Sequence, residues 1–281
     1  MDLRRYLYIS TTITIFTFCI LLFSKVFSSI GFENDGKVYP VELHSVRHDG
    51  YGRELAQNRV SNETAVMSAT SKNLRFNQMN QVYLTFDDGP TKYTNDILDI
   101  LKKHDVQATF FLLDANIKKF PKTVKRIIAE GHSVGCHGVT HRIDMFFMSP
   151  ETALNEIKTC NDSIIASTGF SSKLYRVPFG SYPYMKQPYR DALADEGYIM
   201  WDWNIDSYDW KTNSSQLVVK NIKEQIIPFE NGTISPVLLM HDKLVTSKAL
   251  DSIILLLKEK DFQLVRILET SQPVQFKMVN Q

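Results

Sequence analysis

Residues 82–90 read V-Y-L-T-F-D-D-G-P, an apolar and β-rich run that ends in two adjacent aspartates and a turn. A short apolar run bounded by Gly and Pro is typical of a buried β-strand. Six further runs of this kind follow along the chain, at 108–113, 132–136, 173–177, 198–203, 236–240 and 262–267. The sequence therefore predicts seven strands.

Helical segments separate these predicted strands. Ser149 and Pro150, for example, supply an N-cap and a first-turn proline ahead of apolar residues at helical spacing. Strict alternation of strand and helix predicts an α/β fold with parallel strands and right-handed crossovers, either an open doubly wound sheet or a barrel. Seven strands in about 200 residues fit an incomplete (β/α) barrel.

The composition excludes some classes of protein. The chain has 281 residues, of which 43% are hydrophobic and 22% charged, as in a globular protein with a sizeable core. Its net charge of +1 comes from 32 basic and 31 acidic residues. Residues 1–29 hold three of the basic and one of the acidic residues, which leaves 29 against 30 in the remainder. Residues 30–281, the body of the protein, therefore have a net charge of about −1. This part lacks the positive charge that nucleic-acid binding requires, so we expect no nucleic-acid partner.

The N-terminal segment indicates export. Residues 6–23 carry no charge and follow Arg4 and Arg5. This length is near the minimum for spanning a bilayer, so residues 1–28 are predicted to form a transmembrane anchor or, alternatively, a cleavable signal peptide. Either reading places the body outside the cytoplasm, as a single-pass membrane protein or a secreted one. The polar residues 29–78 are predicted to form a stalk, and residues 79–281 the folded domain.

Polar side chains gather where the predicted strands end. Active sites of parallel α/β folds lie at the carboxyl ends of the strands. The residues found there are Asp87, Asp88, His137, His141, Arg176, Asp206, Asp209, Trp210 and His241. We therefore expect one mouth of the barrel to bring them together.

Two histidines stand four positions apart in H-G-V-T-H, residues 137–141. Alone, this spacing is compatible with a metal site or with a structural role, and no glutamate lies between them, which excludes the common metalloprotease arrangement. D-D-G-P by itself is typical of a turn. Together, however, Asp87 and Asp88 can give one carboxylate to a metal and leave the other to accept a proton. Two His and one Asp leave coordination positions open for water, as in catalytic zinc sites.

Five short blocks occur in a fixed order: T-F-D-D-G-P, H-G-V-T-H, R-V-P-F-G, D-S-Y-D-W and L-L-M-H-D. In these blocks the chain resembles the polysaccharide deacetylase family, also called carbohydrate esterase family 4 or the NodB-homology domain, over roughly residues 81–270. The resemblance implies a metal-dependent deacetylase of N-acetylated sugars on a distorted, incomplete (β/α) barrel. Within this family, the chain resembles membrane-anchored peptidoglycan N-acetylglucosamine deacetylases.

The resemblance also implies roles for the base and the metal ligands. It makes Asp87 the general base and Asp88, His137 and His141 the ligands of a divalent metal. Arg176 would hold the base, because a neighbouring cation favours an ionised carboxylate. Two His and one Asp suit zinc first, with cobalt, nickel or iron as alternatives.

The remaining blocks imply the other site residues. The backbone N–H of Phe179 would stabilise the oxyanion, and His241 would act as general acid, oriented by Asp209. Trp210 would wall the acetyl pocket, and Leu239 would line it around the methyl group.

Two positions depart from the family pattern. Gly138 stands where serine or threonine usually follows the first metal-binding histidine, and R-V-P-F replaces R-P-P-Y. The missing hydroxyl at position 138 predicts a less rigid loop and weaker metal binding, whereas Phe179 keeps its main-chain donor.

The expected substrate is the N-acetylated glycan of the cell wall, with N-acetylglucosamine of peptidoglycan as the favoured target. Chitin oligomers or another exopolysaccharide are the enzymatic alternative. A catalytically silent protein that binds wall glycan is the alternative from another class, since a fold alone does not prove activity. We expect the chain to act as a monomer, with the membrane as a further partner through its N-terminal helix.

Overall fold

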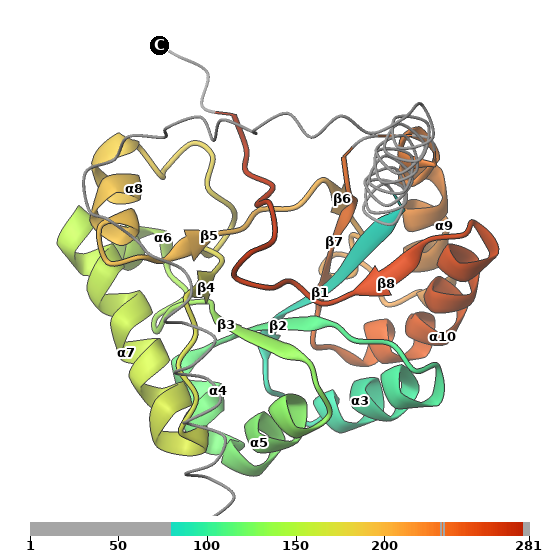
Figure 1. Cartoon of the computed structure of the whole chain (residues 1–281), viewed down its shortest axis with the longest axis horizontal. Helices are drawn as coiled ribbons and strands as arrows, with labels where there is room; N and C mark the ends of the chain where they lie inside the picture. The colour runs from blue at the N-terminus through green and yellow to red at the C-terminus, as the bar shows by residue number, and fades with distance from the viewer. Residues whose placement is uncertain (1–79, 231, 233, 278–281) are drawn as a thin grey trace, which may run out of the picture. The chain divides into compact units, whose positions relative to one another are not determined.

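Eight strands form one sheet in the part of the chain that the computed structural model describes, residues 80–230, 232 and 234–277 (Figure 1). They are β1 (Gln81–Gly89), β2 (Thr109–Leu112), β3 (Ser133–Cys136), β4 (Leu174–Tyr175), β5 (Ile199–Met200), β6 (Ile205–Asp206), β7 (Val237–His241) and β8 (Gln263–Val265). Every pair of neighbouring strands is parallel. The predicted α/β class with parallel strands is therefore confirmed.

The sheet curves into an incomplete barrel. Its strands follow the order β5-β4-β3-β2-β1-β7-β6, and β8 pairs with the first residues of β1. The two ends of this order, β5 and β6, are not paired with each other within the described residues. The barrel is thus open between them, as the predicted incomplete barrel requires.

Helices surround the sheet on its outer face (Figure 1). They are α3 (Thr94–Lys103), α4 (Asp114–Lys119), α5 (Pro121–Ala129), α6 (Ile143–Phe146), α7 (Pro150–Thr168), α8 (Gln187–Ala194), α9 (Ser215–Gln225) and α10 (Leu244–Glu259), with a 3-10 turn η1 (Ile227–Phe229) after α9. Helix α7 begins as predicted, since Ser149 accepts a hydrogen bond from the N–H of Thr152 and Pro150 occupies the first turn.

The alternation of side chains along β1 divides the core into two layers. Leu84 and Phe86 are fully buried and belong to the large apolar cluster that β1 shares with α3, α5, α7 and α10. Tyr83 belongs to a second, smaller cluster with Trp201. Since alternate residues of a strand point to opposite faces, Asp87 lies on the same face as Tyr83. This face is the barrel interior, and it carries Asp87 toward the mouth.

The chain after β8 crosses the barrel and reaches its open side (Figure 1). The N–H of Ile267 donates to the hydroxyl of Thr109, at the start of β2. Further on, the N–H of Asp202 donates to the carbonyl of Val274, and the N–H of Phe276 donates to the Asp202 carboxylate at 2.8 Å. Asp202 lies between β5 and β6, so residues 274–276 pack at the gap between the two edge strands.

The seven predicted strands are all present, but the sheet has one more. The predicted strand at 198–203 is only the two-residue β5, and the short β6 was not predicted. The residues predicted as a membrane segment or signal peptide (1–28) and as a stalk (29–78) lie outside the described part of the chain. Among the helices that are described, none combines the length and apolar character needed to cross a membrane.

Candidate active site

A cavity of about 440 Å³ opens at the carboxyl ends of the strands. Its walls come from β1, β6, β7 and the loops that follow β3, β4, β5, β6 and β7. The lining residues are Asp87, Asp88, His137, His141, Phe179, Trp203, Asp206, Trp210, Leu239, His241 and Lys243. Eight of the ten residues predicted for the site are among them, and Arg176 and Asp209 lie buried behind the wall.

Asp88, His137 and His141 lie together on one side of the cavity. Each offers a ligand atom, and these atoms all lie within 4.8 Å of one another. The Asp88 carboxylate oxygen Oδ1 is 3.5 Å from Nε2 of His137 and 3.3 Å from Nε2 of His141. Asp88 has a positive φ of 69°, and its carbonyl accepts a hydrogen bond from the Asn116 side chain at 2.7 Å. The end of β1 is thereby fixed with the carboxylate facing both imidazoles.

The three side chains fit a divalent metal. The Oδ1 atom of Asp88 is buried without a hydrogen-bond partner among the described residues, a costly state that a bound cation would relieve. His137 directs Nδ1 to the carbonyl of Arg176 at 2.8 Å, which leaves Nε2 free as a ligand. Burial, and then the nearby His137, lower the pKa of His141 and favour its neutral form. Neutral imidazoles and a carboxylate are the donors that zinc and similar ions take.

Arg176 holds Asp87 from inside the barrel. Its guanidinium is fully buried, and Nη1 donates to Asp87 at 2.9 Å and to the Thr85 hydroxyl at 2.7 Å. Its remaining nitrogens donate to the carbonyls of Trp201 and Asp202. A planar guanidinium with this many fixed partners has one available orientation. Asp87 is thus held in place while its second oxygen, Oδ2, lies 3.8 Å from Nε2 of His137.

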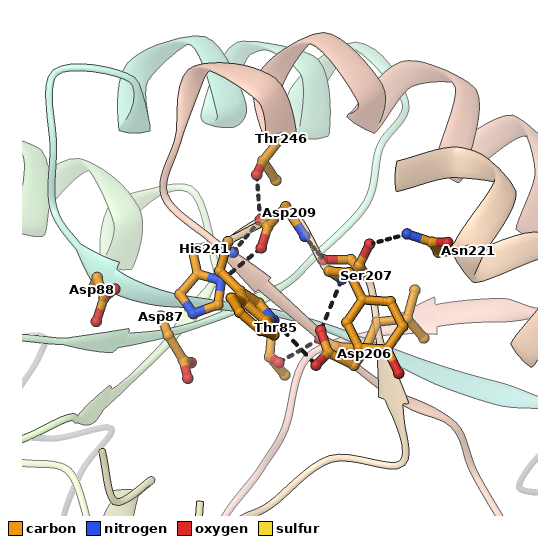
Figure 2. A network of polar contacts seen from close by, with 12 residues as sticks. Thr85, Asp87, Asp88, Asp206, Ser207, Asp209, Asn221, His241 and Thr246 are labelled. Atoms are coloured by element: carbon orange, nitrogen blue, oxygen red, sulfur yellow. Dashed lines mark hydrogen bonds and ion pairs between the residues drawn. The ribbon is translucent and has the colours of Figure 1, made fainter. Parts of the chain in front are cut away.

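His241 stands beside Asp87 because β1 and β7 pair in register at these two residues. Its Nδ1 contacts the Asp209 carboxylate at 2.7 Å, and its backbone N–H donates to the same group at 2.6 Å (Figure 2). Asp209 also accepts a hydrogen bond from the hydroxyl of Thr246. The imidazole is therefore fixed in orientation, with Nε2 available to the cavity.

The Asp209 carboxylate also sets the charge of His241. Burial lowers the pKa of this imidazole, but the hydrogen bond and the charge of Asp209, together with the charges of Asp87 and Asp88, outweigh burial and leave the pKa above its ordinary value. Burial raises the pKa of Asp209 itself, and its hydrogen bonds with His241 and Thr246 reverse that effect and leave it lowered. A protonated His241 beside an ionised Asp209 is the form that can donate a proton near neutral pH.

Two exposed aromatic rings flank the cavity. Phe179 is 55% exposed and Trp210 is 53% exposed, and both line the cavity. The Phe179 ring lies 4.7 Å from that of His141, and the Trp210 indole donates to Asp206 at 3.3 Å. Leu239 is buried in the floor. Apolar and aromatic walls with a few placed polar groups are typical of a ligand-binding pocket.

The sequence comparisons identify the family. Residues 76–200 match the profile of the family described as polysaccharide deacetylase. A peptidoglycan-N-acetylglucosamine deacetylase of Bacillus cereus is 41% identical over 209 residues, which cover 72% of this chain and 76% of that protein. The chain belongs to the polysaccharide deacetylase family.

Solved structures of the family share the fold. The crystal structure of the polysaccharide deacetylase Bc1974 from Bacillus cereus superposes with a TM-score of 0.65 at 39% identity, and covers 70% of this chain and 97% of that one. BA3943 from Bacillus anthracis is described as a pseudoenzyme of carbohydrate esterase family 4. Its structure gives a TM-score of 0.58 at 28% identity, and the match covers 67% of this chain and 64% of that one. Activity within the polysaccharide deacetylase family therefore depends on which side chains line the cavity.

Sequence reasoning missed three residues of the deacetylase cavity wall. Trp203 and Lys243 had no predicted role, and Asp206 was placed at a strand end without one. The signal for Lys243 was its position directly after the H-D pair that ends β7, because residues after strand ends face the mouth. Trp203 lies in the gap between β5 and β6, which the sequence did not reveal.

Replacing Asp209 by Asn is expected to shift the pH profile of deacetylation. The substitution removes the charge that raises the pKa of His241, so the imidazole will lose its proton at a lower pH. Because a general acid works when protonated, activity falls as pH rises through this pKa. The descending alkaline limb of kcat should therefore move to lower pH in Asp209→Asn. A profile with an unmoved alkaline limb would contradict the assignment.

Proposed function

We propose that this protein is a metal-dependent N-deacetylase of peptidoglycan, which hydrolyses the acetamide of N-acetylglucosamine residues to acetate and a free amino sugar. The observation that supports the proposal is that three groups lie together at one cavity. They are the metal ligands Asp88, His137 and His141, the Asp87 carboxylate held by Arg176, and His241 paired with Asp209. Amide hydrolysis requires a polarised carbonyl, a base for water and an acid for the leaving amine. The three ligands, Asp87 and His241 would meet these three requirements in turn.

Our proposed mechanism assigns these steps by position. Asp88, His137 and His141 would hold a divalent metal, for which we propose zinc, and this ion would polarise the acetamide carbonyl and acidify water. Asp87 accepts the proton of the attacking water, and Arg176 keeps that carboxylate in place.

The tetrahedral oxyanion accepts a hydrogen bond from the backbone N–H of Phe179. His241 then donates its Nε2 proton to the amide nitrogen as the C–N bond breaks, which yields acetate and the amine. In this proposal Trp210 and Leu239 enclose the acetyl group.

The cell wall is the proposed substrate because the Bacillus cereus relative is named for that activity and aligns over most of this chain. The uncharged run at residues 6–23 supports a location outside the cytoplasm, anchored in the membrane or secreted. We further propose that the protein works as a monomer, since all the residues assigned to the reaction line one cavity of one chain or lie directly behind its wall.

The presence of a pseudoenzyme among the structural relatives makes catalytic silence the competing hypothesis. A silent glycan-binding protein would need no intact base, ligand set or acid. Asp87, Asp88, His137, His141 and His241 all line the cavity, and this completeness favours an enzyme.

Acetate release is the direct test. The full-length protein is expected to release acetate from purified peptidoglycan faster than from N-acetylglucosamine oligomers. A chelator should abolish release, because it removes the ion that would polarise the acetamide carbonyl, and added Zn²⁺ should restore release. Chelator-resistant release would contradict metal dependence. Faster release from the oligomers would instead favour chitin-type substrates, and glycan binding without acetate release would support the silent protein.

A further inference from the structure

The loop that joins the two histidine ligands has a strained backbone. His141 has a positive φ of 49°, which is strained for a residue other than glycine, and Gly138 has a φ of 97°, which glycine adopts without strain. A non-glycine residue in the left-handed region costs about 1 kcal/mol or more and persists when its surroundings hold it there. The ligand geometry of residues 137–141 therefore needs support from outside the loop.

Glu156 of helix α7 provides contacts to the centre of this loop. Its Oε2 accepts hydrogen bonds from the N–H groups of Val139 at 2.9 Å and Thr140 at 3.1 Å. Its Oε1 accepts a hydrogen bond from the Thr140 hydroxyl at 2.5 Å. Glu156 is only 7% exposed, so solvent does not compete for these contacts. One carboxylate thus binds three donors that lie between the two metal ligands.

The same carboxylate explains the glycine at position 138. A Cβ on Gly138 would lie 2.9 Å from Oε2 of Glu156 and 3.3 Å from the ring of Phe146. A side chain at this position would therefore collide with the carboxylate as well as strain the backbone. The loop lacks a hydroxyl at residue 138, and Glu156 occupies the space next to it and supplies the rigidity.

We propose that Glu156 is a positioning residue of the metal site, which holds residues 137–141 in the conformation that brings His137 and His141 to one ion. The proposal rests on the proposed function only in requiring that the triad binds a metal. Helix α7 is a firm support for this carboxylate, because it runs for 19 residues and is capped by Ser149. Charge-assisted hydrogen bonds to backbone N–H groups are among the stronger contacts available for such a role.

The test compares metal affinity in full-length variants, without glycan. Dissociation constants for Zn²⁺ and Co²⁺ are measured by competition with a chromophoric chelator, and the Co²⁺ absorption spectrum reports the ligand geometry. Glu156→Ala is expected to weaken binding by roughly 10–100-fold, the usual effect of losing a group that orients metal ligands. Glu156→Gln should rescue most of this loss, because its amide oxygen accepts from both N–H groups while its NH₂ donates to the Thr140 hydroxyl.

Asn161→Ala is the matched control. Asn161 lies on the same helix, is buried to a similar degree and bonds Ser171 and Ser172, away from the loop. This variant should keep the wild-type metal affinity. Thr140→Val, which removes only the donor to Oε1, should weaken binding by less than Glu156→Ala and serves if the latter does not fold.

The outcomes separate the two proposals. Wild-type affinity and an unchanged Co²⁺ spectrum in Glu156→Ala would overturn the positioning role, as would an equal loss in Asn161→Ala or an absence of metal binding by the wild type. If the wild type binds metal, Glu156→Ala weakens it and neither protein releases acetate from peptidoglycan, the positioning role stands and the proposed function fails.

Discussion

Replacing Asp87 by Asn is expected to lower kcat for acetate release by roughly 10²–10⁴-fold, the range that a general base contributes. The amide cannot accept the proton of the attacking water. Its oxygen can still accept the hydrogen bond from Arg176, so the buried guanidinium keeps a partner and the fold is preserved. Because Asp87 is not one of the three clustered ligands, bound metal should remain near the wild-type level.

Asp206→Asn is a useful comparison for this variant, since Asp206 lines the same cavity and bonds Trp210. Its effect on kcat should be less than about tenfold, as it neither transfers a proton nor binds the metal in the proposed mechanism. Metal content is measured in both proteins alongside kcat. An Asp87→Asn enzyme that turns over at the wild-type rate would remove Asp87 from the base role.

Replacing His137 by Ala is expected to remove both the metal and the activity. Metal polarisation supplies several kcal/mol of transition-state stabilisation, so kcat/KM should fall by roughly 10³-fold or more. The substitution also removes the hydrogen bond from Nδ1 to the Arg176 carbonyl, which links the metal site to the group that holds the base. Metal analysis of the purified variant, together with acetate release at added Zn²⁺, checks this result.

His132 provides the matched histidine for that experiment. It precedes the same strand, β3, at the opposite end from His137, and its Nδ1 accepts a hydrogen bond from the N–H of Ala108. Burial lowers its pKa to about 4, so it is a neutral core residue. His132→Ala should lose stability but retain metal and activity per folded molecule. Equal metal loss in both variants would show that the effect comes from the strand and not from the ligand.

Much of the site could be predicted because strand-end residues in a parallel sheet converge on one mouth. Asp87 and His241 illustrate this, since each lies near the carboxyl end of its strand and the pairing of β1 with β7 sets them side by side. Alternation along β1 likewise determines that Asp87 faces inward. These outcomes depend on periodicity and chain order, which a sequence displays directly.

The contributions that escaped prediction depend on contacts across the fold. Strand β6 is two residues long, and its Asp206 backbone bonds the side chain of Gln225 from α9 in place of a further strand. No hydrophobic period of useful length marks such a strand. Glu156 lies on a helix, where a buried glutamate looks like any other polar position until the loop that it binds is placed next to it.

The pairing of the last strand with the first has a consequence for how the domain is made. Synthesis proceeds from the N-terminus, so β1 is complete long before β8 (Gln263–Val265) exists to pair with its first residues. The Asp202 carboxylate likewise waits for the N–H of Phe276. Contacts between such distant parts of a chain form slowly, and the barrel can be completed only after residues 263–276 have been synthesised. A chain truncated just before Phe276 lacks the contact with Asp202. This truncation should therefore impair folding of the entire domain.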